Sequence, residues 1–146
     1  MRALNATAVL VLILLTGCAA VPMASMEADT SAKQFQPKKG QANIYLYRNE
    51  TFGAAIAMTV SLNGKVMGKT GAQTYFLWEV PPGRYEIVSH TENTARIAIN
   101  AQEGRNHYVW QEVKMGLWQP RSQLHEMKEE EGKKAVLECK RTIEGE

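Results

Sequence analysis

The chain has 146 residues, of which 45% are hydrophobic and 22% are charged, and its formal net charge at pH 7 is +2. This length and composition are typical of one globular domain with a core of ordinary size. A charge this close to balance argues against nucleic acid as a partner, because nucleic-acid binding favours a clustered basic face.

Residues 1–17 have the pattern of a secretory signal peptide. Arg2 provides a positive start, and Ala6 to Leu15 form a mostly apolar run. About ten apolar residues are typical of a signal peptide, whereas a membrane-spanning helix needs roughly 20. We therefore expect residues 1–17 to act as an export signal and not to form part of the folded domain.

The first of the two cysteines follows this run directly. Leu15-Thr16-Gly17-Cys18 resembles the lipobox of bacterial lipoproteins, in which leucine and two small residues precede a cysteine. The resemblance implies cleavage between Gly17 and Cys18 and acylation of Cys18, so that membrane lipid is its partner. The alternative is an ordinary signal peptide in which Cys18 is incidental.

The residue after the cysteine bears on which membrane is involved. Ala19 stands where an aspartate would resemble an inner-membrane retention signal. We therefore expect a lipid anchor in the outer membrane with the domain facing the periplasm. An acylated Cys18 would leave Cys139 without an intramolecular disulfide partner, and we expect Cys139 to be a buried thiol on a helix.

Residues 18–40 are expected to comprise the acylated cysteine and a flexible tether. The stretch 21–40 is rich in small, polar and charged residues, contains two prolines, and shows neither strand nor helix periodicity. About 20 flexible residues have a root-mean-square span of roughly 25 Å. Such a tether would let the folded domain stand clear of the lipid surface.

From Gln41 onward, short alternating segments predict β-strands. Ile44 and Leu46 alternate with Tyr45 and Tyr47, and a second alternating run covers residues 56–62. Asn63-Gly64 then predicts a type I′ hairpin turn. Further strands are expected at 74–80, 84–89, 96–100 and 106–113, with Pro82-Gly83 as a type II turn before the second of them.

The end of the chain differs from the strands before it. After a short strand around Leu124, residues 129–141 begin with glutamates and end with Lys140 and Arg141, the polarity that a helix dipole favours. Val136, Cys139 and Ile143 lie at helical spacing. The sequence therefore predicts, for residues 41–146, a mainly β domain: an antiparallel β-sandwich or barrel-like fold with a short C-terminal α-helix.

Several segments in this order resemble a family of small Gram-negative lipoproteins catalogued as a domain of unknown function. They follow the lipobox and are "IYLYR" (44–48), "SLNGKVMG" (61–68), "VPPGRYEI" (80–87), "EGRNHYVW" (103–110) and "EEEGKKAVLECK" (129–140). The resemblance covers nearly the whole chain after Cys18. It implies a compact β domain and no activity.

No pattern in the chain points to catalysis or to a metal. His90, His107 and His125 belong to different predicted elements and lack the spacing of a zinc site, which needs about four convergent ligands. Nucleophile-elbow, phosphate-loop and EF-hand patterns are not found. We therefore expect no metal, no cofactor and no enzyme activity, although distant residues could still assemble a site.

The aromatic residues are the remaining candidates for binding. Alternation favours Phe76 and Trp78 as core residues, and it turns Tyr45 and Tyr47 away from Ile44 and Leu46, toward the surface. Trp118, between a glycine and a proline, remains undecided. Tyr45, Tyr47 and Trp118 together form the predicted binding surface.

The resulting functional hypothesis is an outer-membrane lipoprotein that acts as a non-catalytic binding or assembly module of the cell envelope. Its partner would be an envelope protein or a glycan. Two alternatives stay open. One is a structural envelope lipoprotein without a discrete ligand, and the other is a periplasmic hydrolase whose site is dispersed over several strands.

Overall fold

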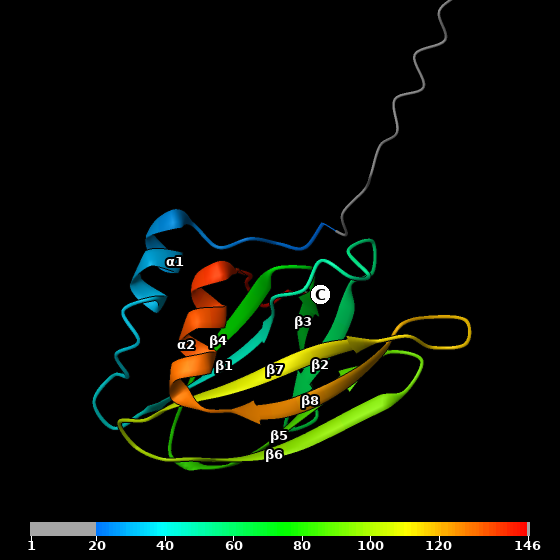
Figure 1. The fold of residues 1–146 in the computed structure, drawn as a ribbon. Coiled ribbons are helices and arrows are strands. Elements are labelled where there is room, and N and C mark those ends of the chain that lie inside the picture. The colour runs from blue at the N-terminus through cyan, green and yellow to red at the C-terminus, as the bar shows by residue number, and fades with distance from the viewer. Residues whose placement is uncertain (1–19, 146) are drawn as a thin grey trace, which may run out of the picture.

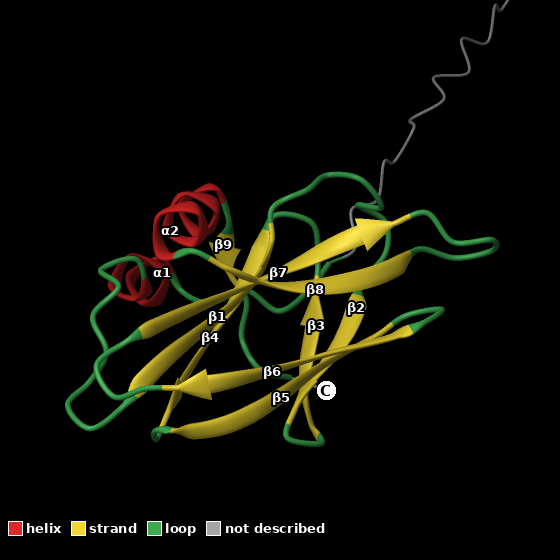
Figure 2. Cartoon of the chain, turned by 60° about the horizontal axis from the view of Figure 1, so that its bottom comes forward, coloured by secondary structure: helices red, strands yellow, loops and turns green. Residues whose placement is uncertain are grey.

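The computed structural model describes residues 20–145, so the predicted signal peptide and Cys18 lie outside the described residues. Two β-sheets pack face to face, and two short helices cover the outer face of the larger sheet (Figures 1 and 2). The helices are α1 (Met26–Ala32) and α2 (Glu129–Glu138). Neither is long and apolar enough to cross a membrane.

The larger sheet has the strand order β8-β7-β1-β4-β9 and the smaller sheet has the order β3-β2-β5-β6. In chain order the strands are β1 (Ala42–Arg48), β2 (Met58–Leu62), β3 (Lys65–Thr70), β4 (Thr74–Val80), β5 (Gly83–His90), β6 (Thr94–Ala101), β7 (Asn106–Lys114), β8 (Arg121–Met127) and β9 (Lys140–Arg141). The predicted mainly β sandwich with a short C-terminal helix is confirmed. The sheets are mostly antiparallel, but β1 pairs with β7, and β4 with β9, in parallel.

One of the two predicted turns has the expected backbone and the other does not. Asn63 and Gly64 both have positive φ, 48° and 79°, as the type I′ turn between β2 and β3 requires. Gly83 has a φ of 159°, far from the value near +80° that a type II turn gives its glycine. The type II prediction is therefore wrong, because Gly83 is already the first residue of β5 and pairs with Ala101.

The main core lies between the two sheets. Phe76 and Trp78 are buried there, as predicted, and their rings stack with centroids 5.5 Å apart. They pack with the inward residues of strands from both sheets, which include Ile44, Leu46, Val60, Ile87, Ile99 and Val109. Inward apolar residues from every strand except β9 therefore hold the sandwich together.

The prediction that Tyr45 and Tyr47 are exposed is wrong. Both point away from the main core, as alternation requires, but they are only 0% and 2% exposed. With Tyr75 and Tyr108 they form a second core beneath the two helices. The outer face of the larger sheet is thus a buried layer, because α1 and α2 cover it.

The prediction of a flexible tether over residues 21–40 is also wrong for most of that segment. Ser25 caps α1 through its side chain, which accepts a hydrogen bond from the Ala28 amide. The Tyr45 hydroxyl donates to the Ala32 carbonyl at 2.7 Å, and the Tyr75 hydroxyl donates to Asp29 Oδ1 at the same distance. Two buried tyrosines therefore hold α1 on the sheet.

The segment before α1 is attached as well. Met23 bridges to Thr142, and the Ala24 amide donates to the Arg141 carbonyl at 3.0 Å. After α1, Lys33 Nζ donates to the carbonyl of Cys139 at 2.7 Å. The beginning and the end of the described chain are therefore bound to each other.

The end of α2 corrects one further expectation. The helix stops at Glu138, so Cys139 is its C-cap, and β9 follows. Cys139 is buried, as predicted, and burial raises the pKa of its thiol to about 12. Ile143, expected to pack from the same helix, lies beyond it and is partly exposed.

Gly132 in the first turns of α2 is required by packing. A Cβ at this position would overlap the ring of Tyr108. At an exposed helix position, alanine in place of glycine stabilises the protein by about 1 kcal/mol. At position 132 we expect the same change to destabilise it. We expect Gly132→Ala to lower the free energy of unfolding by about 1–3 kcal/mol, the usual cost of overpacking, measured by urea denaturation.

Lys134→Ala is the control for this substitution. Lys134 lies on the exposed side of the same helix, and surface changes usually remain within about 0.5 kcal/mol. A Gly132→Ala chain that is as stable as the unsubstituted chain, or more stable, would contradict the close approach of α2 to Tyr108.

Candidate functional site

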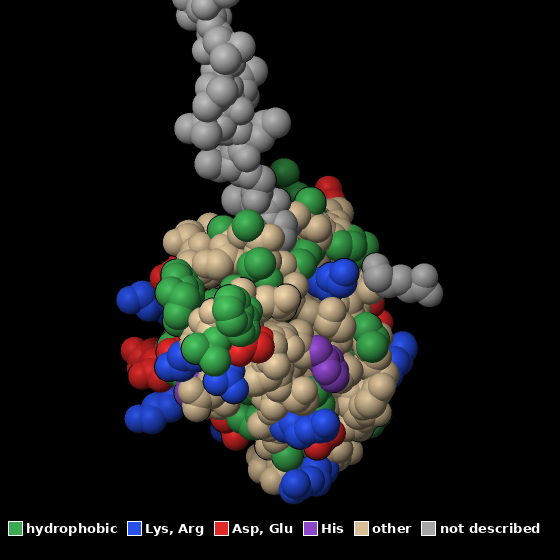
Figure 3. Space-filling model, turned by 90° about the vertical axis from the view of Figure 1, so that its right-hand side faces the viewer, with side chains coloured by type: hydrophobic (Ala, Val, Ile, Leu, Met, Phe, Trp, Pro, Cys, Tyr) green, Lys and Arg blue, Asp and Glu red, His purple; other side chains and the backbone are tan. Residues whose placement is uncertain are grey.

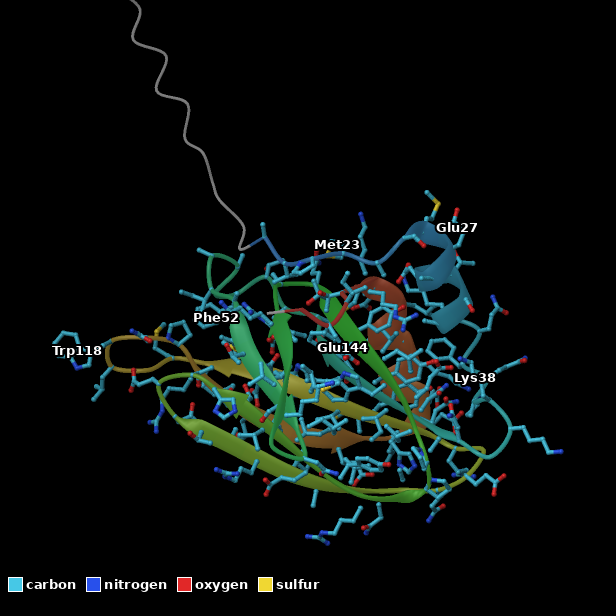
Figure 4. The ribbon with its side chains drawn as sticks, turned by 180° about the vertical axis from the view of Figure 1, so that it is seen from behind. Met23, Glu27, Lys38, Phe52, Trp118 and Glu144 are labelled. Atoms are coloured by element: carbon cyan, nitrogen blue, oxygen red, sulfur yellow. The ribbon has the colours of Figure 1, made fainter. Side chains whose placement is uncertain are left out.

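The two most exposed large apolar residues of the described chain, Leu117 and Trp118, lie on the loop between β7 and β8. These two strands pair as far as Lys114 and Arg121, and the loop of residues 115–120 extends beyond the body of the sandwich (Figure 1). Met115, Leu117 and Trp118 are 78%, 88% and 92% exposed. Figure 4 shows the Trp118 side chain directed away from the domain.

The structure therefore separates the three predicted binding residues. Trp118 is at the tip of an exposed loop, while Tyr45 and Tyr47 lie beneath the helices and take no part in a surface. Met115 and Leu117 were not among the predicted site residues. Their signal in the sequence is the run Met-Gly-Leu-Trp-Gln-Pro, which places large apolar residues in a turn between two polar strand ends.

A second loop, residues 49–57, contributes further apolar side chains. Phe52 and Ile56 are 49% and 38% exposed. The loop is organised by Arg48, whose buried guanidinium donates hydrogen bonds to the carbonyls of Phe52, Gly53 and Ile56 at 3.3, 2.6 and 2.7 Å. Burial lowers the pKa of Arg48, and these carbonyls replace the water that the guanidinium loses.

The two loops are neighbours. Glu50 Oε2 accepts a hydrogen bond from the Val113 amide at 3.2 Å, and burial raises the pKa of Glu50. Gly53 faces the side chains of Val113 and Pro120. We call the exposed apolar side chains of both loops the apical surface; they are Phe52, Ile56, Met115, Leu117 and Trp118.

The hairpin turn between β5 and β6 supports the β7–β8 loop. Glu92 accepts hydrogen bonds from the amides of Trp118 and Gln119 at 3.2 and 3.0 Å. These donors, the Gln119 amide first, hold the pKa of Glu92 below its ordinary value. The Asn93 side chain accepts from the Ser122 amide and donates to its carbonyl. The loop tip is thus tied to the opposite sheet.

A buried polar chain lies under the same end of the sandwich. The Thr70 hydroxyl donates to Gln111 Oε1 at 2.5 Å, and Gln111 Nε2 donates to Ser89 Oγ at 2.7 Å. Ser89 and Ser122 share a further hydrogen bond of 2.7 Å. These residues come from strands of both sheets. The chain of hydrogen bonds therefore holds the two sheets together beneath the apical surface.

An open cleft of about 460 Å³ adjoins the β7–β8 loop, between the edges of β6 and β8. Arg96, Lys114 and Arg121 line it together with Met115. Lys114 pairs with Glu112, and Arg96 pairs with Glu86, whereas Arg121 has no ion-pair partner within residues 20–145. Figure 3 looks onto this end and shows hydrophobic side chains beside lysine and arginine side chains.

Side chains able to perform acid–base chemistry do not gather at this surface. His125 contacts Glu112 at 2.7 Å and stacks on Trp110. Ser61 and His90 lie 3.1 Å apart, but Ser61 is buried within β2. No group of three or more metal-ligating side chains is found among the described residues.

These features define the chain as a β-sandwich domain covered by helices on one face, with an exposed apolar surface at one end. The chain belongs to the family described as "Protein of unknown function (DUF2846)", which matches residues 38–123. That range includes both loops of the apical surface and excludes α1 and α2.

The chain is also similar to another bacterial protein over most of its length. The chain is 34% identical over 128 residues to an "Uncharacterized protein" of Haemophilus influenzae, covering 86% of this chain and 76% of that protein. No solved structure matches the chain.

The support of the loop by Glu92 can be tested through its titration. The lowered pKa means that both hydrogen bonds persist at pH values above 4.5 and are lost as the pH falls through the folded-state pKa. We expect the amide protons of Trp118 and Gln119 to shift together over that acidic range in NMR spectra. In Glu92→Gln, which cannot titrate, this shift should vanish; its persistence would assign the titration to another group.

Proposed function

We propose that this protein is an outer-membrane lipoprotein, anchored by acylated Cys18, whose domain faces the periplasm and acts as a non-catalytic binding or assembly module. The anchor rests on the sequence Leu15-Thr16-Gly17-Cys18 behind an apolar run with a basic start. Several acyl chains on one cysteine would make attachment stable, since a single chain binds only marginally.

The observation that carries the binding role is the apical surface. Three large apolar side chains in one six-residue loop are almost fully exposed, and such a patch on a protein surface is typical of an interaction site. Tryptophan is among the residues that contribute most to binding when a partner buries them. The hydrogen bonds to Glu92 and Asn93 hold the loop in place before any partner arrives.

The experiment introduces one reactive thiol at the loop tip and follows acylation in the same cells. In Trp118→Cys, the introduced thiol should react slowly with a small permeant maleimide in intact envelopes and rapidly after detergent solubilisation. Cys139 should contribute little, because it is buried and its thiol pKa is raised to about 12. The chain should also incorporate a fatty-acid analogue and fractionate with the outer membrane.

Two further variants serve as controls. Val66→Cys places a thiol on the exposed β2–β3 hairpin, away from the apical surface, and it should react equally in both conditions. Cys18→Ala should abolish fatty-acid incorporation. A chain that keeps its label without Cys18 would disprove the anchor, while a thiol at position 118 that reacts as fast as the one at 66 in envelopes would disprove the binding surface.

A further inference from the structure

The apical surface lies on the same side of the molecule as the beginning of the described chain. In Figures 1 and 2, the first described residues, the 49–57 loop and the tip of the β7–β8 loop follow one side of the domain. Figure 4 shows Met23, Phe52 and Trp118 in this order along the same side.

The chain between the proposed anchor and the domain is short. Met23 already bridges to Thr142, and the Ala24 amide is bonded to Arg141. The five residues from Cys18 to Met23 span at most about 18 Å when fully extended. This step rests on the proposed function: if Cys18 carries lipid, the side of the domain that bears the apical surface is held next to the membrane.

The chemistry of this side matches the interface of a bilayer. Met115, Leu117 and Trp118 are apolar side chains at the tip of a loop, and tryptophan is enriched where lipid head groups meet acyl chains. Behind the tip, Arg96, Lys114 and Arg121 line the cleft. Arg96 and Lys114 are in salt bridges, while Arg121 forms none in the described chain and acts on the nearby Glu92 carboxylate only through its charge. Cations at this depth attract the phosphates of anionic lipids.

We propose that the partner of the apical surface is the lipid bilayer itself. The β7–β8 loop inserts Met115, Leu117 and Trp118 at the boundary between head groups and acyl chains, and the adjoining cleft faces anionic head groups. The acylated Cys18 and this loop then form two attachment points, which fix the orientation of the domain on the membrane.

The test uses the acylated full chain, purified and reconstituted into vesicles of phosphatidylethanolamine and phosphatidylglycerol without other proteins. Lipids brominated near the head group quench tryptophans that enter the interface, and iodide quenches those that remain in water. Trp118 should be quenched by the brominated lipid and protected from iodide, with its emission shifted to shorter wavelength. Trp118→Phe reports the background from Trp78 and Trp110 and should lose this lipid-dependent signal.

A charge reversal tests the cleft separately. Arg121→Glu should reduce quenching by the brominated lipid, and the reduction should grow with the fraction of phosphatidylglycerol. Arg84→Glu is the matched control. Arg84 is exposed and lies at the start of β5, at the end away from the hairpin that contacts the β7–β8 loop, and outside the apical surface. Equal effects of the two reversals would overturn the assignment of anionic lipid to the cleft.

Mass spectrometry of the same sample separates the possible failures. An unacylated Cys18 would overturn the proposed anchor and this inference with it. An acylated chain in which iodide still reaches Trp118 would overturn the bilayer contact alone. In a third outcome, Trp118 is protected from iodide only after an envelope protein extract is added. That result would identify a protein as the partner and would also overturn the proposal.

Discussion

Two hydrogen bonds from buried tyrosines hold α1, and with it the N-terminal segment, against the larger sheet. A tyrosine hydroxyl that leaves water without finding a partner costs about 1–3 kcal/mol, and the Tyr108 hydroxyl of this cluster is buried without one among the described residues. The Tyr45 hydroxyl finds the Ala32 carbonyl and the Tyr75 hydroxyl finds Asp29. Because both partners belong to α1, the hydroxyls of Tyr45 and Tyr75 can be buried in this way only when α1 is in place.

The same contacts limit the distance between the domain and any lipid on Cys18. Once α1, Ala24 and Met23 are attached, few residues remain to act as a spacer. A lipoprotein with a long tether samples the periplasm freely, whereas a short one keeps a defined side toward the membrane. Under the proposed anchor, lipid would cover Trp118, whose exposure to water on that side is otherwise unfavourable.

The sequence predicts the sandwich well because its evidence is local. Alternation along β1 correctly separates Ile44 and Leu46 from Tyr45 and Tyr47, and Asn63-Gly64 correctly predicts a hairpin turn. What alternation cannot show is whether the second face of a strand meets water or another layer. That layer comes from residues 26–32 and 129–138, and Tyr108, whose ring would overlap any side chain at position 132, is 24 residues away in sequence.

The candidate surface could be predicted only in part for the same reason. Trp118 stood out as an aromatic residue between a glycine and a proline, but Phe52 and Ile56, the other loop's part of the apical surface, lie more than 60 residues earlier. Arg48 holds the 49–57 loop through hydrogen bonds to its carbonyls, and Glu50 joins that loop to β7 at the Val113 amide; these bonds leave no periodic pattern in the sequence. The helix α1 had a local signal, Ser25 followed by acidic residues, but only one or two turns of helix follow it.

Neutron reflectometry of the acylated protein on a supported bilayer tests the central claim most directly, because it measures the layer of water between lipid and protein. A domain held by a short attachment and seated on its apical surface predicts protein density that begins at the head groups. A flexible tether of 20 residues would instead leave a water-rich layer of about 25 Å. Observation of that layer would contradict the account.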